Sequence, residues 1–152
     1  MGAHRADTGL RHDEGGPALR HQLLVYPALD PTTSSASYRE LSDDYLLSAA
    51  DMRWYWHQYL GCADPAHPDI APAGADLAGL PPATVLTAEY DPLRDEGEDY
   101  ARRLDDAGVP VDLHRIGGVI HGFFRWRAVT PAAAEAMETA SAALRAALAP
   151  PR

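Results

Sequence analysis

The sequence is poor in cysteine: Cys62 is the only one among 152 residues. A single thiol excludes an internal disulfide and is typical of a reducing compartment, and we interpret Cys62 as a small buried side chain. No apolar run approaches the roughly 18 residues that a membrane-spanning helix needs, and Met1–His12 lacks the apolar centre of a signal peptide. These absences predict a cytoplasmic protein with no membrane partner.

Basic residues are also scarce. The sequence has 13 Lys and Arg residues against 22 Asp and Glu residues, which gives a net charge of -9 and a pI near 5.1. Nucleic acids and anionic membranes bind clustered positive charge, so we expect neither as a partner. His57 and His67 have no cysteine or carboxylate at ligand spacing, and we therefore expect no metal site and no cofactor.

Three short apolar runs indicate strands. Ala83–Tyr90 and Val109–Ile116 are too short for a globular helix and are bounded by Pro or Gly, while Leu19–Leu29 is stopped by proline. Between the second and third runs we expect a helix, with Pro92 in its first turn and Gly108 at its end. Strand, helix and strand of this length form a βαβ unit. The fold class is therefore predicted as α/β, with about three parallel strands flanked by helices.

Capping residues indicate two further helices. Ser48 and Asp51 form a capping-box pattern, which predicts a helix that runs to about Leu60. Thr130, followed by proline, caps a final helix that runs to about Leu148. The first helix is expected to lie against the sheet or against a partner, or else to offer its aromatic residues to a substrate, and the final helix is expected to pack on the sheet.

Two side chains fall where a parallel sheet binds its ligands. Asp91 directly follows the second predicted strand, and His121 follows the third by a few residues. Because ligands sit outside the carboxyl ends of parallel strands, we expect the two side chains to meet there. A carboxylate that orients an imidazole is the acid–base half of a Ser-His-Asp triad.

The same residues also have structural interpretations. Asp91 precedes Pro92 and can equally serve as a helix N-cap. His121 can be a loop imidazole with no role in chemistry. Glu96, in the first turn of the following helix, is most simply a partner of the helix dipole.

Several segments resemble one known family. Bacterial hormone-sensitive-lipase-like carboxylesterases, a branch of the α/β-hydrolase fold, have a C-terminal catalytic segment similar to LPPATVLTAEYDPLRDEGEDYARRLDDAGVPVDLHRIGGVIHGFF (residues 80–124). Upstream family segments are similar to LRHQLLVYPALD and YLLSAADMRWYWHQYLG, so the resemblance begins at about Glu14. By the DPLRDEG and HGFF motifs, it implies that Asp91 is the triad acid and His121 the triad base of an esterase or lipase.

The sequence also departs from this family. The family's nucleophilic serine lies in a GDSAG-type elbow and its oxyanion hole in an HGGG-type loop, and neither motif occurs here. No serine has G-x-S-x-G surroundings; the six are Ser34, Ser35, Ser37, Ser42, Ser48 and Ser141. The resemblance therefore implies the C-terminal half of a carboxylic ester hydrolase, with the acid and the histidine but without the nucleophile, and with little activity of its own.

These features suggest a division of the sequence and two hypotheses for its function. We expect residues 1–17 to be a flexible tail and residues 18–152 to be the C-terminal portion of an α/β-hydrolase domain. On the first hypothesis, the chain acts on a small acyl ester once another segment supplies the nucleophile. On the second, it is a non-catalytic interaction or oligomerisation module that self-associates through the open edge of its first strand, where the family's elbow strand pairs.

Overall fold

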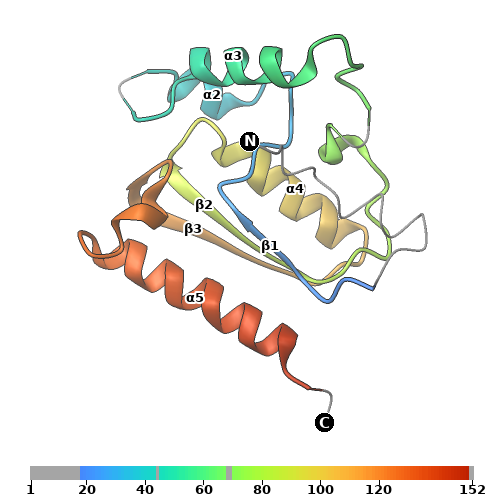
Figure 1. Cartoon of the computed structure of the whole chain (residues 1–152), viewed down its shortest axis with the longest axis vertical. Coiled ribbons are helices and arrows are strands. Elements are labelled where there is room, and N and C mark those ends of the chain that lie inside the picture. Colours follow the sequence, from blue (N-terminus) through green and yellow to red (C-terminus); the bar gives the residue numbers. More distant parts are fainter. Residues whose placement is uncertain (1–17, 44, 68–69, 151–152) are drawn as a thin grey trace.

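The computed structural model describes residues 18–43, 45–67 and 70–150, which form one parallel sheet with helices around it. The strands are β1 (Gln22–Val25), β2 (Ala83–Tyr90) and β3 (Val111–Ile120), in the order β1-β2-β3 (Figure 1). Both strand pairs are parallel. The predicted α/β class is therefore confirmed, whereas the tail predicted for residues 1–17 lies outside the described residues.

The helices form layers on both faces of this sheet. Within the described ranges they are α2 (Ala36–Glu40), α3 (Ala49–Leu60), α4 (Arg94–Asp106) and α5 (Pro131–Leu148), with short 3-10 turns at Pro72–Gly74 and Phe123–Trp126. α4 covers one face and α5 the other, while α2 and α3 lie beyond α4, over the end of the sheet at which β2 ends (Figure 1). None of these helices is both long and apolar enough to cross a membrane.

The core between the sheet and α4 follows from helical spacing. Tyr100, Ala101 and Leu104 project from one face of α4 onto Val85 of β2, and all four side chains are buried. Residues three and four apart share one face of a helix, and such a stripe covers a sheet. Gly108 ends this segment with a φ of +78°, a left-handed conformation that glycine adopts without steric cost.

The opposite face of the sheet packs against small side chains of α5. Ala133, Ala136 and Ala140 are buried there against Leu86 of β2 and Phe123, which follows β3. Alanine has a short side chain, so the helix approaches the sheet closely. This contact fixes the segment that carries Phe123 just beyond the end of β3.

Two strands differ in length from the sequence prediction. β1 is shorter because Tyr26, the residue after Val25, has a φ of +39°, which turns the chain out of the extended conformation. β3 is longer and continues to Ile120 through an irregular pairing with β2. Gly118 has a φ of +70°, and its N–H donates to Oε2 of Glu89 at 2.7 Å. A backbone kink at glycine thus extends β3.

The capping-box prediction for α3 is confirmed, and the prediction for Cys62 is wrong. The Asp51 N–H donates to Ser48 Oγ, and the Ser48 N–H donates to Asp51 Oδ2, each at 3.0 Å. Cys62 is exposed rather than buried. It directly follows Gly61, at which α3 ends, and so lies in an exposed turn.

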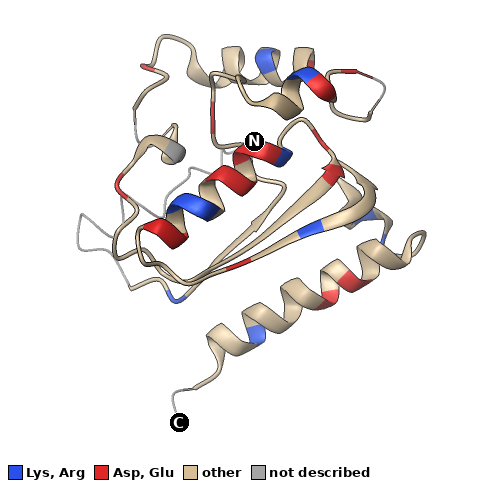
Figure 2. Ribbon diagram, turned by 180° about the vertical axis from the view of Figure 1, so that it is seen from behind, with Lys and Arg blue, Asp and Glu red and all other residues tan. Residues whose placement is uncertain are grey.

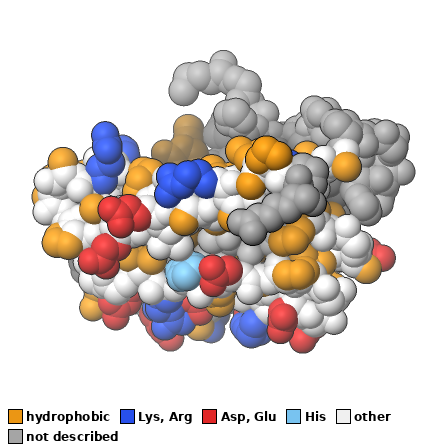
Figure 3. All heavy atoms as spheres, turned by 90° about the horizontal axis from the view of Figure 1, so that it is seen from below, with side chains coloured by type: hydrophobic (Ala, Val, Ile, Leu, Met, Phe, Trp, Pro, Cys, Tyr) orange, Lys and Arg blue, Asp and Glu red, His pale blue; other side chains and the backbone are white. Residues whose placement is uncertain are grey.

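Acidic and basic side chains are mixed on the surface. Figure 2 shows both kinds along α4, and Figure 3 shows both among hydrophobic side chains on the face seen from below. Two ion pairs of α4 are Arg115 with Glu98, at 2.6 Å, and Arg102 with Asp99. Exposed pairs of this kind contribute little to stability, so we attribute the fold chiefly to its apolar contacts.

Glu96 joins α4 to the loop after β1 from a buried position. Its side chain is not a simple exposed partner of the helix dipole, because the residue is only 4% exposed. Oε1 accepts hydrogen bonds from the N–H groups of Leu29, at 2.7 Å, and Asp30, at 3.4 Å. Burial raises the pKa of Glu96 to about 8, against the opposing effect of these bonds, and burial and the Glu96 charge raise the pKa of Tyr38 on α2.

We expect Leu104→Ala to lower the free energy of unfolding by about 2–5 kcal/mol, because it leaves a cavity between α4 and β2. Leu104 is fully buried, whereas Leu148, near the end of α5, is 68% exposed. Leu148→Ala is therefore the matched control and should change stability by less than about 1 kcal/mol. Urea unfolding followed by circular dichroism measures both, and equal losses would contradict the packing described.

The raised pKa of Glu96 predicts that the free energy of unfolding depends on pH. The raised pKa means that the folded chain keeps a proton, between pH 4.5 and about 8, that the unfolded chain has released. The free energy of unfolding should therefore fall as pH rises through this window. Glu96→Gln cannot titrate, so relative to the parent it should gain about 2–4 kcal/mol between pH 5 and pH 8.

Urea unfolding at the two pH values measures this gain. Glu138→Gln, on the exposed side of α5, is the matched control and should follow the parent at both pH values. Parallel pH dependences of the parent and Glu96→Gln would show that the Glu96 carboxyl is not held in its neutral form.

Candidate active site

The two predicted site residues lie at the same edge of the sheet. Asp91 follows Tyr90, the last residue of β2, and His121 follows Ile120, the last residue of β3. Tyr90 and Ile120 are paired in the parallel register. The strands therefore end side by side, and each delivers its next residue to the same edge.

The carboxylate and the imidazole are in direct contact. His121 Nδ1 lies 2.8 Å from Asp91 Oδ2, a hydrogen-bond distance. Asp91 is fully buried, while the side chain of His121 remains 23% exposed. When Nδ1–H donates to the carboxylate, the lone pair of the imidazole is on Nε2, the atom that accepts a proton from a nucleophile.

A tight turn holds Asp91 in place. Its Oδ1 accepts a hydrogen bond from the N–H of Leu93 at 2.9 Å, and its backbone carbonyl accepts one from the N–H of Arg94 at 3.0 Å. The N-cap of α4 is Leu93, two residues after Asp91. The interpretation of Asp91 as the N-cap is therefore wrong: Asp91 binds the Leu93 N–H in the turn before the helix and pairs with His121 through its other oxygen.

The aromatic ring of Tyr26 packs against the imidazole of His121. The ring of Tyr26 lies with its centroid 4.5 Å from that of His121, and it also contacts the rings of Phe123 and Phe124 edge-on. Tyr26 combines this contact with the positive φ that ends β1. A bulky residue in this conformation is strained, and such strain often occurs at functional sites. Sequence periodicity gave no signal for this role.

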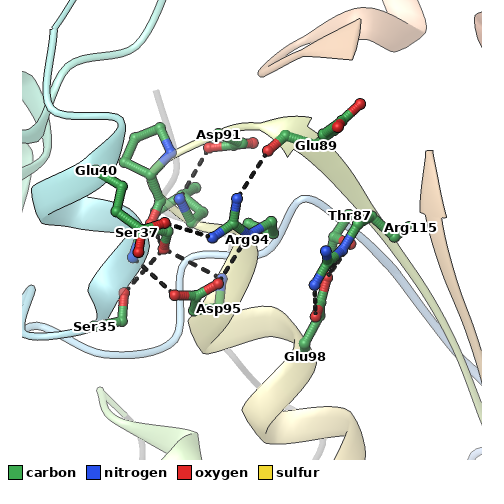
Figure 4. Close-up of polar contacts among 12 residues, drawn as sticks. Ser35, Ser37, Glu40, Thr87, Glu89, Asp91, Arg94, Asp95, Glu98 and Arg115 are labelled. Carbon is green, nitrogen blue, oxygen red and sulfur yellow. Dashed lines mark hydrogen bonds and ion pairs between the residues drawn. The ribbon is translucent and has the colours of Figure 1, made fainter. Parts of the chain in front are cut away.

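Arg94 connects the turn that carries Asp91 to β2 and to α2. Its guanidinium donates to the backbone carbonyl of Glu89 at 3.2 Å and pairs with Asp95 at 2.8 Å and with Glu40 of α2 at 3.2 Å (Figure 4). Glu89 precedes the site on β2, and Asp95 follows it on α4. The guanidinium therefore bridges both sides of the turn that carries Asp91.

No serine in the described part of the chain is hydrogen-bonded to His121. Ser37 is buried against Pro92, and Ser48 caps α3. The others lie in the loop after β1, beside Asp43 or on α5; they are Ser34, Ser35, Ser42 and Ser141. Among the described residues, the structure thus brings together the predicted acid and base, with none of the six serines bonded to the imidazole.

A metal ion has no evident place at this site. Across the described ranges, no group of three or more His, Cys, Asp and Glu side chains is arranged to hold one. The donors at the site are one carboxylate and one imidazole, and these are engaged with each other. A carboxylate hydrogen-bonded to an imidazole is an arrangement suited to proton transfer.

Comparison with known proteins places the chain in a family. A family profile described as alpha/beta hydrolase fold matches residues 5–125. Carboxylesterase NlhH of Mycobacterium tuberculosis is 43% identical over 150 residues, which cover 91% of this chain and 45% of the relative. Carboxylic ester hydrolase LipN of the same organism is 44% identical over 113 residues, which cover 72% of this chain and 30% of the relative.

Solved structures of esterases are also similar to this chain. A thermostable esterase from Pseudomonas putida superimposes with a TM-score of 0.89 at 39% identity, over 93% of this chain and 46% of that structure. A hyperthermophilic esterase from Pyrobaculum calidifontis gives a TM-score of 0.87 at 39% identity, over 91% of this chain and 46% of that structure.

The chain spans about half the length of the similar structures, and between about a third and a half of the two relatives. The resemblance seen in the sequence is nevertheless confirmed over most of its length. This chain belongs to the α/β-hydrolase family, in its hormone-sensitive-lipase-like carboxylesterase branch, and represents part of that fold.

Proposed function

We propose that this chain supplies the acid and the histidine of a carboxylic ester hydrolase whose nucleophilic serine comes from another segment. Asp91 orients the imidazole, and His121 acts as the general base and then as the general acid. The observation that carries the proposal is the 2.8 Å contact between Asp91 Oδ2 and His121 Nδ1 at the carboxyl ends of β2 and β3.

The proposed reaction moves one proton in two directions. As the serine oxygen attacks the ester carbonyl carbon, Nε2 of His121 takes the serine proton. The imidazolium then gives this proton to the departing alcohol oxygen, and an acyl-serine remains. Water attacks the acyl-serine by the same steps and releases the carboxylic acid. Asp91, already bonded to Nδ1, stabilises the imidazolium in both halves without accepting its proton.

Small acyl esters are the substrate class that the relatives support. An ethyl acetate hydrolase from Pseudomonas putida, 38% identical over 122 residues, is named for a small acyl ester, and NlhH is named as a carboxylesterase. The G-x-S-x-G motif and an HGGG-type loop are absent from the 152 residues. Another segment must therefore bring both the serine and the backbone donors for the oxyanion.

The outer edge of β1, with which no other strand of the described residues pairs, is the proposed docking place for that segment. The N–H of Gln22 donates to the carbonyl of Pro82, just before β2, and the N–H of Tyr26 donates to that of Leu86 on β2. The backbone groups of Leu23 and Val25 therefore point to the other side. A strand added there, parallel to β1, ends beside Tyr26, whose ring contacts His121. This position brings a residue after the added strand to the edge that holds the imidazole.

A chimera tests the proposal. The N-terminal half of NlhH, fused in front of this chain, should hydrolyse p-nitrophenyl butyrate, whereas the chain alone should not. In the chimera, His121→Ala should abolish turnover, and Asp91→Asn should lower kcat by about 10³–10⁴-fold, because the imidazole loses its orienting carboxylate.

His114→Ala is the matched control for this experiment. His114 lies on β3 and pairs with exposed Asp112, away from the site, so its loss should leave kcat unchanged. Full turnover by a folded His121→Ala chimera would contradict the assigned base. Turnover by the chain alone, lost on substitution of one of its six serines, would contradict an external nucleophile.

The open edge of β1 also supports a second candidate function, self-association as a non-catalytic module. Leu23, Leu24 and Val25 are only partly buried, and an unpaired edge is a template for another strand. On this candidate, two copies of the chain pair through β1 and no ester is hydrolysed.

Sedimentation equilibrium tests the second candidate. The parent should show a mass that rises with concentration. Leu23→Lys, once circular dichroism shows it folded despite the contact of Leu23 with the α5 core, should remain monomeric because it places a charge on the edge strand. Leu113→Lys, on the other edge strand β3, is the matched control and should associate like the parent. A parent that stays monomeric, or a Leu23→Lys chain that associates equally, would exclude pairing through β1.

A further inference from the structure

The position of the Asp91 carboxylate depends on the backbone of one turn. The N–H of Leu93 binds Oδ1 of Asp91, and the N–H of Arg94 binds its carbonyl oxygen. The second oxygen, Oδ2, is the partner of His121. Any shift of the turn therefore moves the carboxylate relative to the imidazole. Pro92, between these residues, has no N–H, and its carbonyl is directed out of the turn toward α2.

The carbonyl of Pro92 is bound by a serine that lies 55 residues earlier. The Ser37 hydroxyl, on α2, donates to Pro92 O at 2.6 Å, the shortest serine hydrogen bond described. Both residues are fully buried. A buried hydrogen bond that loses its donor leaves the carbonyl unsatisfied, which is costlier than the loss of an exposed one.

Ser37 is itself fixed by α4. Its N–H donates to Asp95 Oδ2 at 2.7 Å, and the Asp95 N–H donates back to Ser37 Oγ at 3.3 Å. Arg94 holds the other carboxylate oxygen of Asp95, and Figure 4 shows these side chains converging between α2 and the start of α4. The Ser37 hydroxyl also lies 3.0 Å from Ser35 Oγ. It is thus held by Ser35 and Asp95, with its proton directed at Pro92.

We propose that Ser37 is a positioning residue for Asp91, and that α2 sets the geometry of the acid–histidine pair through this serine. The inference rests on the proposed function, because Asp91 has catalytic meaning only if that function holds. It also gives a role to one of the six serines: Ser37 is fully buried and committed to Pro92, so it is not the nucleophile but a support for the acid.

A simpler role, in which Ser37 only anchors α2, predicts a different result. An anchor affects global stability and the order of α2. A positioning residue also changes the hydrogen bond between Asp91 and His121 in molecules that remain folded. The proton on Nδ1 of His121 reports that bond, because a proton shared with a buried carboxylate resonates far downfield and exchanges slowly with water.

Proton NMR of the full chain measures this signal, which is assigned by its loss in His121→Asn. In Ser37→Ala the proton should exchange with water at least about fivefold faster than in the parent, the factor that corresponds to about 1 kcal/mol. The amide protons of Val85 and Leu86 in the core of β2 report global opening, and they should change less than the Nδ1 proton. Ser141→Ala, on α5, is the matched control and should match the parent.

A second variant tests the same proposal if Ser37→Ala does not fold. Ser37→Cys keeps a side chain of similar size with a weaker donor, and it should give an exchange rate between those of the parent and the alanine variant. Unchanged Nδ1 exchange in a folded variant would overturn the positioning role and leave the proposed function standing. Absence of the downfield proton from the parent would instead remove the acid–histidine pair, and with it both proposals.

Discussion

The parallel pairing of β2 with β3 is the constraint on which the site depends. Because Tyr90 lies opposite Ile120, the chain leaves both strands at the same edge, and the next residues are Asp91 and His121. An antiparallel pair would place these side chains at opposite ends of the sheet. The helix between the strands makes the parallel arrangement possible, and its Leu104 packs in one core with Val85 of β2 and with Val109, which precedes β3.

Two buried carboxyl groups within one short segment show how the surroundings determine the behaviour of an acid. Each oxygen of Asp91 accepts a hydrogen bond, one from Leu93 and one from His121. The described hydrogen bonds to Glu96 reach only Oε1, and burial raises its pKa to about 8. Burial disfavours the charged form of a carboxyl group, and at Glu96 this effect outweighs the hydrogen bonds to Oε1.

The sequence predicted the parts of this arrangement that depend on short-range patterns. The apolar runs indicated the three strands, the Ser48 and Asp51 pattern indicated the start of α3, and the positions of Asp91 and His121 after their strands indicated the pair. Each of these depends on the spacing of neighbouring residues. The topological rule for parallel sheets then joined local patterns into one site.

The other parts of this arrangement depend on contacts between residues that are far apart in the sequence. The spacing of neighbouring residues does not predict such contacts. Ser37 and Pro92 are 55 residues apart, and Leu29 and Glu96 are 67 apart. Nothing in the sequence around Ser37 distinguishes it from the neighbouring serines. The positive φ of Tyr26, which shortens β1 and sets its ring against His121, likewise becomes visible only when the fold is assembled.

The hydrogen bond between Asp91 and His121 is the central claim, and a double-mutant cycle tests it most directly. The free energies of unfolding of the parent, Asp91→Asn, His121→Asn and the double variant are measured in urea at one pH. We expect the two substitutions to be non-additive, with an interaction energy of about 0.5–3 kcal/mol, because each single variant breaks the same contact. Additive effects, within about 0.3 kcal/mol, would contradict a direct interaction between the two side chains.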